Sequence, residues 1–210
     1  MGGAAASVRD LRLLQFIGEQ CAVAQPQLAR IAGVGEEAVR KFRRNWERAG
    51  WTRACVVASG RPPIVWLTGR GHRVASVWFR PWRPTRPHHV NHIVAAAEVR
   101  LYVSARRPTA RWICERELLR RDLAAGLGRE RHRPDALVQT EGGTAAVEVE
   151  LTLKSRERLE RIALELHSRY DAVWYFAPRE LIPQLDERLR SYGLAQQIQL
   201  VELPDPWRRA

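Results

Sequence analysis

The stretch that decides the fold of the second half of the chain runs from His132 to Ser155 and reads HRPDALVQTEGGTAAVEVELTLKS. From residue 147 to residue 154, apolar and polar residues alternate strictly, and successive side chains of a strand point to opposite faces. The pattern predicts an apolar face with Val147, Val149, Leu151 and Leu153, and a polar face with Glu148, Glu150, Thr152 and Lys154. Residues 133–138 predict a shorter strand opened by a proline, and residues 141–143 predict the hairpin turn between the two strands. This hairpin would bring Asp135 toward Glu148 and Glu150.

A proline-aspartate pair, a hairpin and an acidic-x-acidic strand followed by lysine together resemble the PD-(D/E)XK nuclease-like fold. Mg²⁺ prefers hard oxygen ligands, commonly one or two carboxylates with water and phosphate. The resemblance implies a site for Mg²⁺ or Mn²⁺ held by Asp135 and Glu148, with Glu150 and Glu115 as outer or second-metal ligands. Lys154 would be the amine that activates water or stabilises charge on a phosphate. The sequence departs from the family pattern because Glu150 stands where the catalytic lysine is expected.

The same acidic pattern has a simpler interpretation. Glu148 and Glu150 would line a solvated sheet face and pair with arginines, without binding any metal. The sequence leaves both interpretations open.

The charge of the chain is concentrated at its front. The 210 residues carry a formal net charge of +12, and residues 1–87 hold 15 basic and 5 acidic side chains. This balance favours a polyanionic partner such as double-stranded DNA. The three cysteines are scattered without CxxC spacing, and neither a membrane-spanning run nor a signal peptide is evident, so the sequence predicts a cytoplasmic protein. Its oligomeric state stays open, with a homodimer as one option.

The front of the chain predicts a winged helix-turn-helix domain over residues 8–80. A first helix over residues 8–20, a short second helix from Gln25 and a third helix from Glu36 to Ala49 follow the helix-turn-helix order. Two β-rich runs, 53–57 and 64–67, flank a basic tip and predict the wing. The predicted DNA-binding residues in this domain are Arg40, Lys41, Arg43, Arg44, Arg48 and Arg61. A protein-docking module with a solvated basic face is the alternative.

The proline-rich segment 81–87 predicts a linker, and a loop packed on one domain by Trp82 is the alternative. The remaining residues 88–206 predict an α/β domain with helices on both faces of a mixed sheet. Its expected order is a long helix over 88–106, a strand over 111–118, the two hairpin strands, a helix from Ser155, a buried strand over 172–177, a helix over 180–192 and a last strand over 198–203. Glu115 and Glu117 would share a face of the first strand. Arg156, Arg158 and Arg161, at the start of the helix after Ser155, would hold phosphates.

Three further motifs carry a resemblance that covers nearly the whole chain. They are WxxExEL from Trp112 to Leu118, RPDAL from Arg133 to Leu137 and VEVELTxKS from Val147 to Ser155. Together with the front domain they resemble the replication-relaxation family of plasmids and mobile elements. The resemblance implies a DNA-binding protein acting on such an element. An active metal-dependent endonuclease and a transcriptional regulator with a dimerisation or docking scaffold are the two alternatives.

Overall fold

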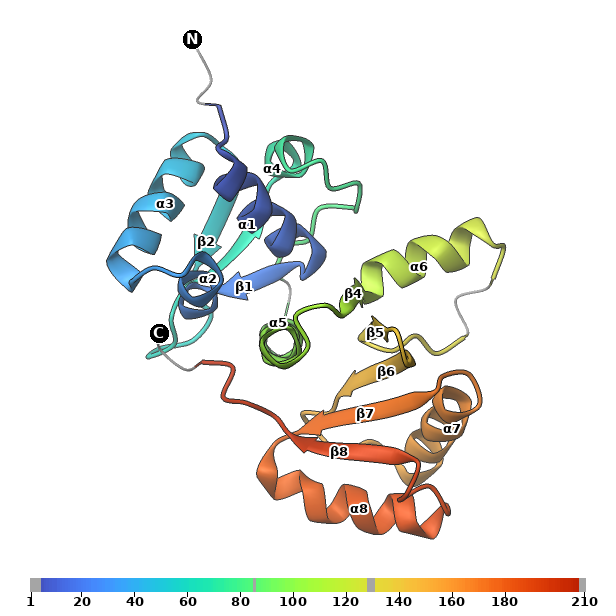
Figure 1. Cartoon of the computed structure of the whole chain (residues 1–210). Coiled ribbons are helices and arrows are strands. Elements are labelled where there is room, and N and C mark those ends of the chain that lie inside the picture. Colours follow the sequence, from blue (N-terminus) through green and yellow to red (C-terminus); the bar gives the residue numbers. More distant parts are fainter. Residues whose placement is uncertain (1–4, 85, 128–130, 208–210) are drawn as a thin grey trace. The chain divides into compact units, whose positions relative to one another are not determined.

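The computed structural model describes residues 5–84, 86–127 and 131–207 (Figure 1). The chain divides into two compact units, the first comprising Met1–Leu101 with Asp205–Ala210 and the second Tyr102–Pro204. Both helices and sheets occur, so the expected mixed α/β class is confirmed. In the described ranges, no helix has the length and apolar character needed to cross a membrane.

The first unit places helices around a three-stranded sheet of order β1-β3-β2 (Figure 1). Its strands are β1 (Ala22–Ala24), β2 (Thr52–Cys55) and β3 (Ile64–Leu67), and both pairings are antiparallel. Its helices are α1 (Val8–Glu19), α2 (Gln25–Ala32), α3 (Glu36–Arg48), α4 (Gly69–Val74) and the larger part of α5 (Pro87–Arg106). The predicted helices and hairpin are confirmed. Strand β1 was not predicted, since three residues are too few to show a period.

Local signals in the sequence set the helix ends in this unit. The Ser7 hydroxyl accepts a hydrogen bond from the Asp10 amide, and the Asp10 carboxylate accepts one from the Ser7 amide, which is a capping box. Gly33 ends α2 in the left-handed conformation at φ 64°. The Thr68 hydroxyl caps α4 by accepting from the Gly71 amide at 3.0 Å, as its position after the hairpin predicted.

The division between the units falls inside α5, whereas the sequence predicted a linker at residues 81–87. Trp82 in that segment packs against Trp66 of β3, with ring centroids 6.3 Å apart. Val90 and Val94 of α5 are buried in the same apolar cluster. Apolar burial therefore attaches the proline-rich segment and the start of α5 to the first unit.

The second unit contains a mixed sheet of order β4-β5-β6-β7-β8. The first three strands are antiparallel, and β6, β7 and β8 are parallel, as the predicted helical crossovers require. The strands are β4 (Arg111–Cys114), β5 (Ala136–Thr140), β6 (Gly143–Val149), β7 (Ala172–Ala177) and β8 (Ile198–Glu202). The helices are α6 (Glu115–Ala124), α7 (Arg156–His167), the 3-10 turn η1 (Arg179–Leu181) and α8 (Ile182–Ser191).

Helices α7 and α8 cover one face of this sheet (Figure 1). Leu159, Ile162 and Leu166 of α7 and Leu185 and Leu189 of α8 are buried there together with strand residues of the same face. On the other face, the Tyr102 ring at the end of α5 contacts Phe176 of β7, with centroids 5.7 Å apart. Both faces are thus apolar and buried, which is typical of parallel strands.

Two local predictions in this unit are wrong. The strand predicted over 111–118 ends at Cys114, and Glu115 begins α6. Two acidic residues in the first turn favour a helix start because they face the positive end of the helix dipole. The strand predicted to continue to Lys154 ends at Val149, since the chain must leave the sheet to enter α7.

Candidate nucleic-acid interface and carboxylate site

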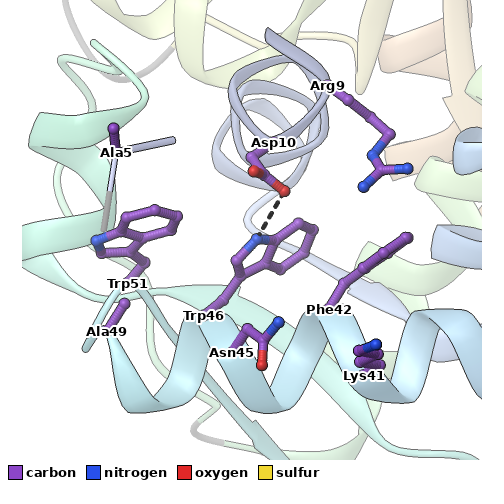
Figure 2. A pocket seen from close by; sticks show the side chains of 9 residues that line it. All are labelled: Ala5, Arg9, Asp10, Lys41, Phe42, Asn45, Trp46, Ala49 and Trp51. Carbon is purple, nitrogen blue, oxygen red and sulfur yellow. Dashed lines mark hydrogen bonds between the residues drawn. The ribbon is translucent and has the colours of Figure 1, made fainter. Parts of the chain in front are cut away.

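Helix α3 has two chemically different faces. Val39 and Trp46 are buried in the core of the first unit, and the Trp46 indole donates a hydrogen bond to the Asp10 carboxylate of α1 at 3.0 Å (Figure 2). The exposed basic side chains of α3 are Arg40, Lys41, Arg44 and Arg48. A helix seated by its aromatic residues therefore presents its cations to solvent.

The fifth predicted cation of α3 differs from the others. Arg43 is only 21% exposed, and its guanidinium pairs with Glu47 one turn later at 3.2 Å. Its charge is therefore partly compensated within the helix. Along the exposed side runs a groove of about 540 Å³, lined by Glu37, Ala38, Lys41, Arg44, Asn45 and Arg48.

A second cavity, of about 320 Å³, lies where α3 meets α1 (Figure 2). Figure 2 shows the rings of Phe42, Trp46 and Trp51 along it, with Arg9 beside Phe42. The Arg9 guanidinium lies 4.2 Å from the centroid of the Phe42 ring. These contacts fix the orientation of α3 on α1.

Arg61 lies at the tip between β2 and β3 and is exposed. Its guanidinium lies 4.8 Å from the centroid of the Trp207 ring, which belongs to the C-terminal segment of the same unit. The predicted basic tip of the hairpin is present, and the Arg61 guanidinium stacks on an aromatic ring.

In the second unit, neighbouring strands align three polar residues in one row. Leu137 of β5 pairs with Ala146 of β6, so Asp135, two residues earlier, lies level with Glu148. Glu148 in turn pairs in register with Tyr175 of β7. Residues in register on neighbouring strands project from the same face, here the face covered by α7 and α8. The row stands at the carboxyl ends of parallel strands, where open α/β sheets place their ligands.

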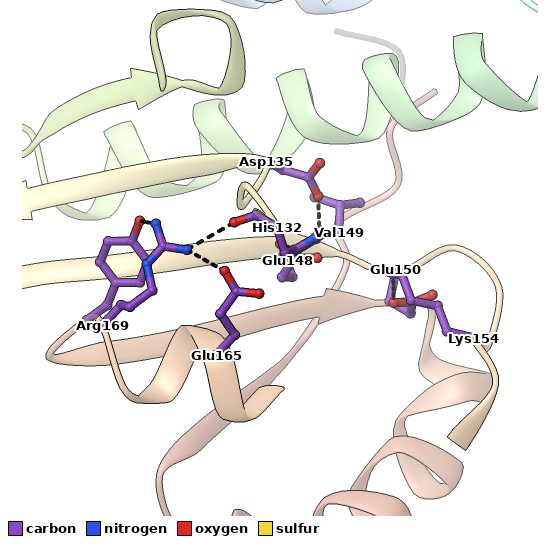
Figure 3. A network of polar contacts seen from close by, with 9 residues as sticks. His132, Asp135, Glu148, Val149, Glu150, Lys154, Glu165 and Arg169 are labelled. Atoms are coloured by element: carbon purple, nitrogen blue, oxygen red, sulfur yellow. Dashed lines mark hydrogen bonds and ion pairs between the residues drawn. The ribbon is translucent and has the colours of Figure 1, made fainter. Parts of the chain in front are cut away.

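Each of the three predicted carboxylates contacts a different partner (Figure 3). Asp135 accepts a hydrogen bond from the Val149 amide at 2.7 Å, replacing the backbone acceptor that β5 no longer offers. Glu148 contacts the imidazole of His132, with Oε1 and Nε2 2.9 Å apart. Glu150 pairs with the amine of Lys154. Lys154, the amine predicted to serve the site, stands in the loop after β6.

Both glutamates of β6 are buried, Glu148 to 3% and Glu150 to 2% exposure. The alternative of a solvated acidic face is therefore wrong, and Glu148 stands on the face that α7 and α8 cover. Burial raises the pKa of Glu148 to about 7. The charge of Asp135 acts in the same direction, while His132 and Lys154 lower the pKa of this carboxyl.

Of the four predicted metal ligands, Asp135 and Glu148 lie level on neighbouring strands, whereas Glu115 belongs to α6. Glu115 is exposed at the start of α6, where its amide donates to the Asp135 carbonyl at 3.1 Å. Within residues 5–84, 86–127 and 131–207, no three or more His, Cys, Asp and Glu side chains are grouped closely enough to hold a metal ion. Asp135 and Glu148, adjacent in one row, are the pair that the fold brings together.

Three residues that the sequence did not single out lie at this site: His132, Arg169 and Tyr175. Arg169, which follows the end of α7, donates to the His132 carbonyl at 3.0 Å and to the Glu165 carboxylate at 2.8 Å, and this holds the loop so that the His132 imidazole meets Glu148 (Figure 3). The Tyr175 hydroxyl is buried and has no hydrogen-bond partner among the described residues. The sequence held one signal for His132 as a site residue, which is that it precedes Asp135 by three residues.

The tyrosine stays protonated at the ends of these strands. Burial, together with the negative charges of Glu148, Glu150 and Asp135, raises the pKa of the Tyr175 phenol. A neutral hydroxyl donor thus stands in register with a buried carboxyl.

The exposed arginines at the start of α7 that were predicted to hold phosphates are Arg156, Arg158 and Arg161.

A scan against models of known protein families finds no match for this chain, and neither does a comparison with curated protein sequences.

Proposed function

We propose that this chain is a DNA-binding protein of the replication-relaxation type, acting on plasmid or mobile-element DNA. Its first unit would be a winged helix-turn-helix domain, with α3 in the major groove and the β2–β3 hairpin as the wing. The observation that carries the proposal is the set of exposed cations on the outer face of α3: Arg40, Lys41, Arg44 and Arg48.

Electrostatics and shape both support this proposal. An α-helix fits the major groove of duplex DNA, and each phosphate contacted by a cation releases condensed counterions. The cations stand on a helix that Trp46 anchors to the core, so the helix itself need not move to meet the groove. Arg61 is exposed at the hairpin tip and, as a wing residue, would contact the DNA backbone.

The test is fluorescence anisotropy with labelled duplex DNA over a series of salt concentrations. Arg44→Ala should weaken binding and reduce the slope of log K against log salt by about 0.9, the value for one lost phosphate contact. Arg43→Ala is the matched control on the same helix and should change the slope less, because Glu47 already compensates Arg43. Binding that is insensitive to salt would refute the duplex interface.

For the second unit we propose a PD-(D/E)XK-like domain that binds one divalent metal ion, Mg²⁺ or Mn²⁺, through Asp135 and Glu148. These two carboxylates fit the requirement of Mg²⁺ for one or two acidic ligands, because their strands are adjacent and their charges interact. When bound, such an ion would polarise a phosphoryl oxygen and activate water. Arg156 and Arg158, exposed at the start of α7, would then hold phosphate groups of the DNA.

Titration calorimetry with Mg²⁺ and with Mn²⁺ tests this site. Wild type should release or absorb heat that Asp135→Asn loses, and asparagine keeps a side-chain oxygen for the Val149 amide, so the fold is preserved. Equal heats from the two proteins would remove Asp135 from the metal site. Nicking of supercoiled plasmid in Mg²⁺, lost in Glu148→Ala, would identify an endonuclease.

A specific observation favours the alternative in which the second unit is a docking scaffold. Each of the three carboxylates already has a protein partner: the Val149 amide, His132 and Lys154. The test compares Asp135→Asn, Glu148→Gln and Glu150→Gln with wild type. If all three leave DNA binding and the heat of metal binding unchanged, the three carboxylates are structural and the scaffold function is supported.

A further inference from the structure

The segment that follows α4 displays one large aromatic side chain to solvent. Val77 is buried, and Phe79 packs against the apolar core of the first unit. Trp78 between them is 90% exposed. An alternation of inward, outward and inward side chains over three residues means that Trp78 is turned outward by the anchoring of both neighbours.

Hydrogen bonds fix the turn that presents this ring. Ser76 has φ 53°, a left-handed conformation that reverses the chain directly after α4. The Val77 amide donates to the His72 carbonyl at 2.9 Å, and Nδ1 of His72 lies 3.3 Å from the Val77 carbonyl oxygen. His72 itself is 5% exposed. The backbone next to Trp78 is therefore fixed, so a partner that contacts the ring does not have to order this turn.

The surroundings of Trp78 in the sequence are cationic. The exposed basic residues of α4 and the following segment are Arg70, Arg73, Arg80, Arg83 and Arg86. The other exposed large hydrophobic residues in the described ranges, Val8, Val56, Leu123, Leu127 and Leu164, lie outside this segment. A single aromatic ring among arginines differs from the several adjacent apolar side chains of a protein interface or a membrane-binding helix.

We propose that Trp78 is a stacking platform for an unpaired nucleobase, with the arginines of the same segment contacting the flanking phosphates. An indole face suits any nucleobase, and the cations suit the anionic backbone on either side of it. Trp82 in the same segment cannot act in this way because it packs on Trp66. The site would take single-stranded DNA or an unpaired end, and it is separate from the duplex contacts proposed for α3.

The experiment uses the full chain, a labelled blunt duplex and the same duplex carrying a single-stranded thymidine tail. Wild type should bind the tailed duplex more tightly than the blunt one. Trp78→Ala should lose roughly 5- to 100-fold in affinity for the tailed duplex, the range of a lost base-stacking contact, with little change on the blunt duplex. Trp78→Phe should restore most of the affinity, because phenylalanine also offers a flat ring.

Val8→Ala is the matched control, since Val8 is also a strongly exposed hydrophobic residue of the first unit, at 68%. Tryptophan fluorescence gives a direct readout: the quenching by an oligothymidine should be larger in wild type than in Trp78→Phe. Absence of a preference for the tail, or an equal loss by Trp78→Ala on both duplexes, would overturn the stacking site. Binding of wild type to anionic phospholipid vesicles, abolished by Trp78→Ala without an effect on oligonucleotides, would assign the ring to a membrane surface instead. Failure of the α3 interface would show differently, as an unchanged salt slope in Arg44→Ala.

Discussion

Replacing Glu148 by glutamine should stabilise the second unit at alkaline pH. The Glu148 carboxyl is 3% exposed, and burial raises its pKa to about 7 from an ordinary value of 4.5. Above this pKa the folded protein must hold a buried negative charge, whereas the unfolded chain holds the same charge in water. Glutamine has nearly the same shape, carries no charge and can accept a hydrogen bond from the His132 imidazole.

The magnitude follows from the pKa. A folded-state pKa above the unfolded value means that the native state binds more protons, so the stability contributed by this group is present below about pH 4.5 and lost as the pH rises through about 7. The difference between the two pKa values corresponds to about 3 kcal/mol. Wild type should therefore lose about 2.5 kcal/mol relative to Glu148→Gln between about pH 5 and about pH 8.

The assay is urea unfolding, monitored through hydrogen exchange of the peptides that cover β6 and β7. These peptides report the stability of the second unit alone. Glu160→Gln, an exposed glutamate of α7, is the control and should show no pH-dependent difference from wild type. Titrating groups that do not interact with Glu148 are common to all three proteins and cancel in the comparison. The reasoning is refuted if Glu148→Gln is less stable than wild type at about pH 8, or if the two proteins keep the same difference at both pH values.

Two further predictions concern the first unit. Arg30→Ala removes the guanidinium that pairs with the buried carboxylate of Glu98, which then keeps Gln27 as a partner. Thermal unfolding should show that the free energy of unfolding falls by about 3–5 kcal/mol. A fall below about 1 kcal/mol would contradict a buried ion pair. Gly71→Ala should prevent the unit from folding, because a Cβ atom there would lie 1.9 Å from the Trp51 carbonyl oxygen, and a native circular dichroism spectrum would disprove this close approach.

Residues near one another in sequence determined most of the local structure. The two-residue period and the Gly142-Gly143 turn predicted the β5–β6 hairpin, and Ser155 predicted the start of α7. The apolar stripe of α3, with Val39 and Trp46, predicted which side of that helix is buried. These features follow from side-chain direction and capping, which act over a few residues and are readable without a structure.

Predictions that needed the spatial environment were the ones that failed. Glu115 and Glu117 alternate as they would in a strand, but both also fit the first turn of a helix, and the helix formed. The strand period assigned Glu148 to the face opposite Val147 and Val149, yet its burial depends on α7 and α8, which are contributed by later parts of the chain. Periodicity assigns a residue to a face, and packing decides whether that face meets water.

The sequence by itself determined the secondary structure of the hairpin, the amphipathic α3 and the concentration of positive charge in the first 87 residues. Only the tertiary structure decided that Asp135 and Glu148 share a row with Tyr175, that His132 rather than a third carboxylate meets Glu148, and that α5 begins in one unit and ends in the other. The physical reason is that hydrogen-bond periods and caps are local, whereas a buried polar row is set by strand register and by the segments that exclude water from it.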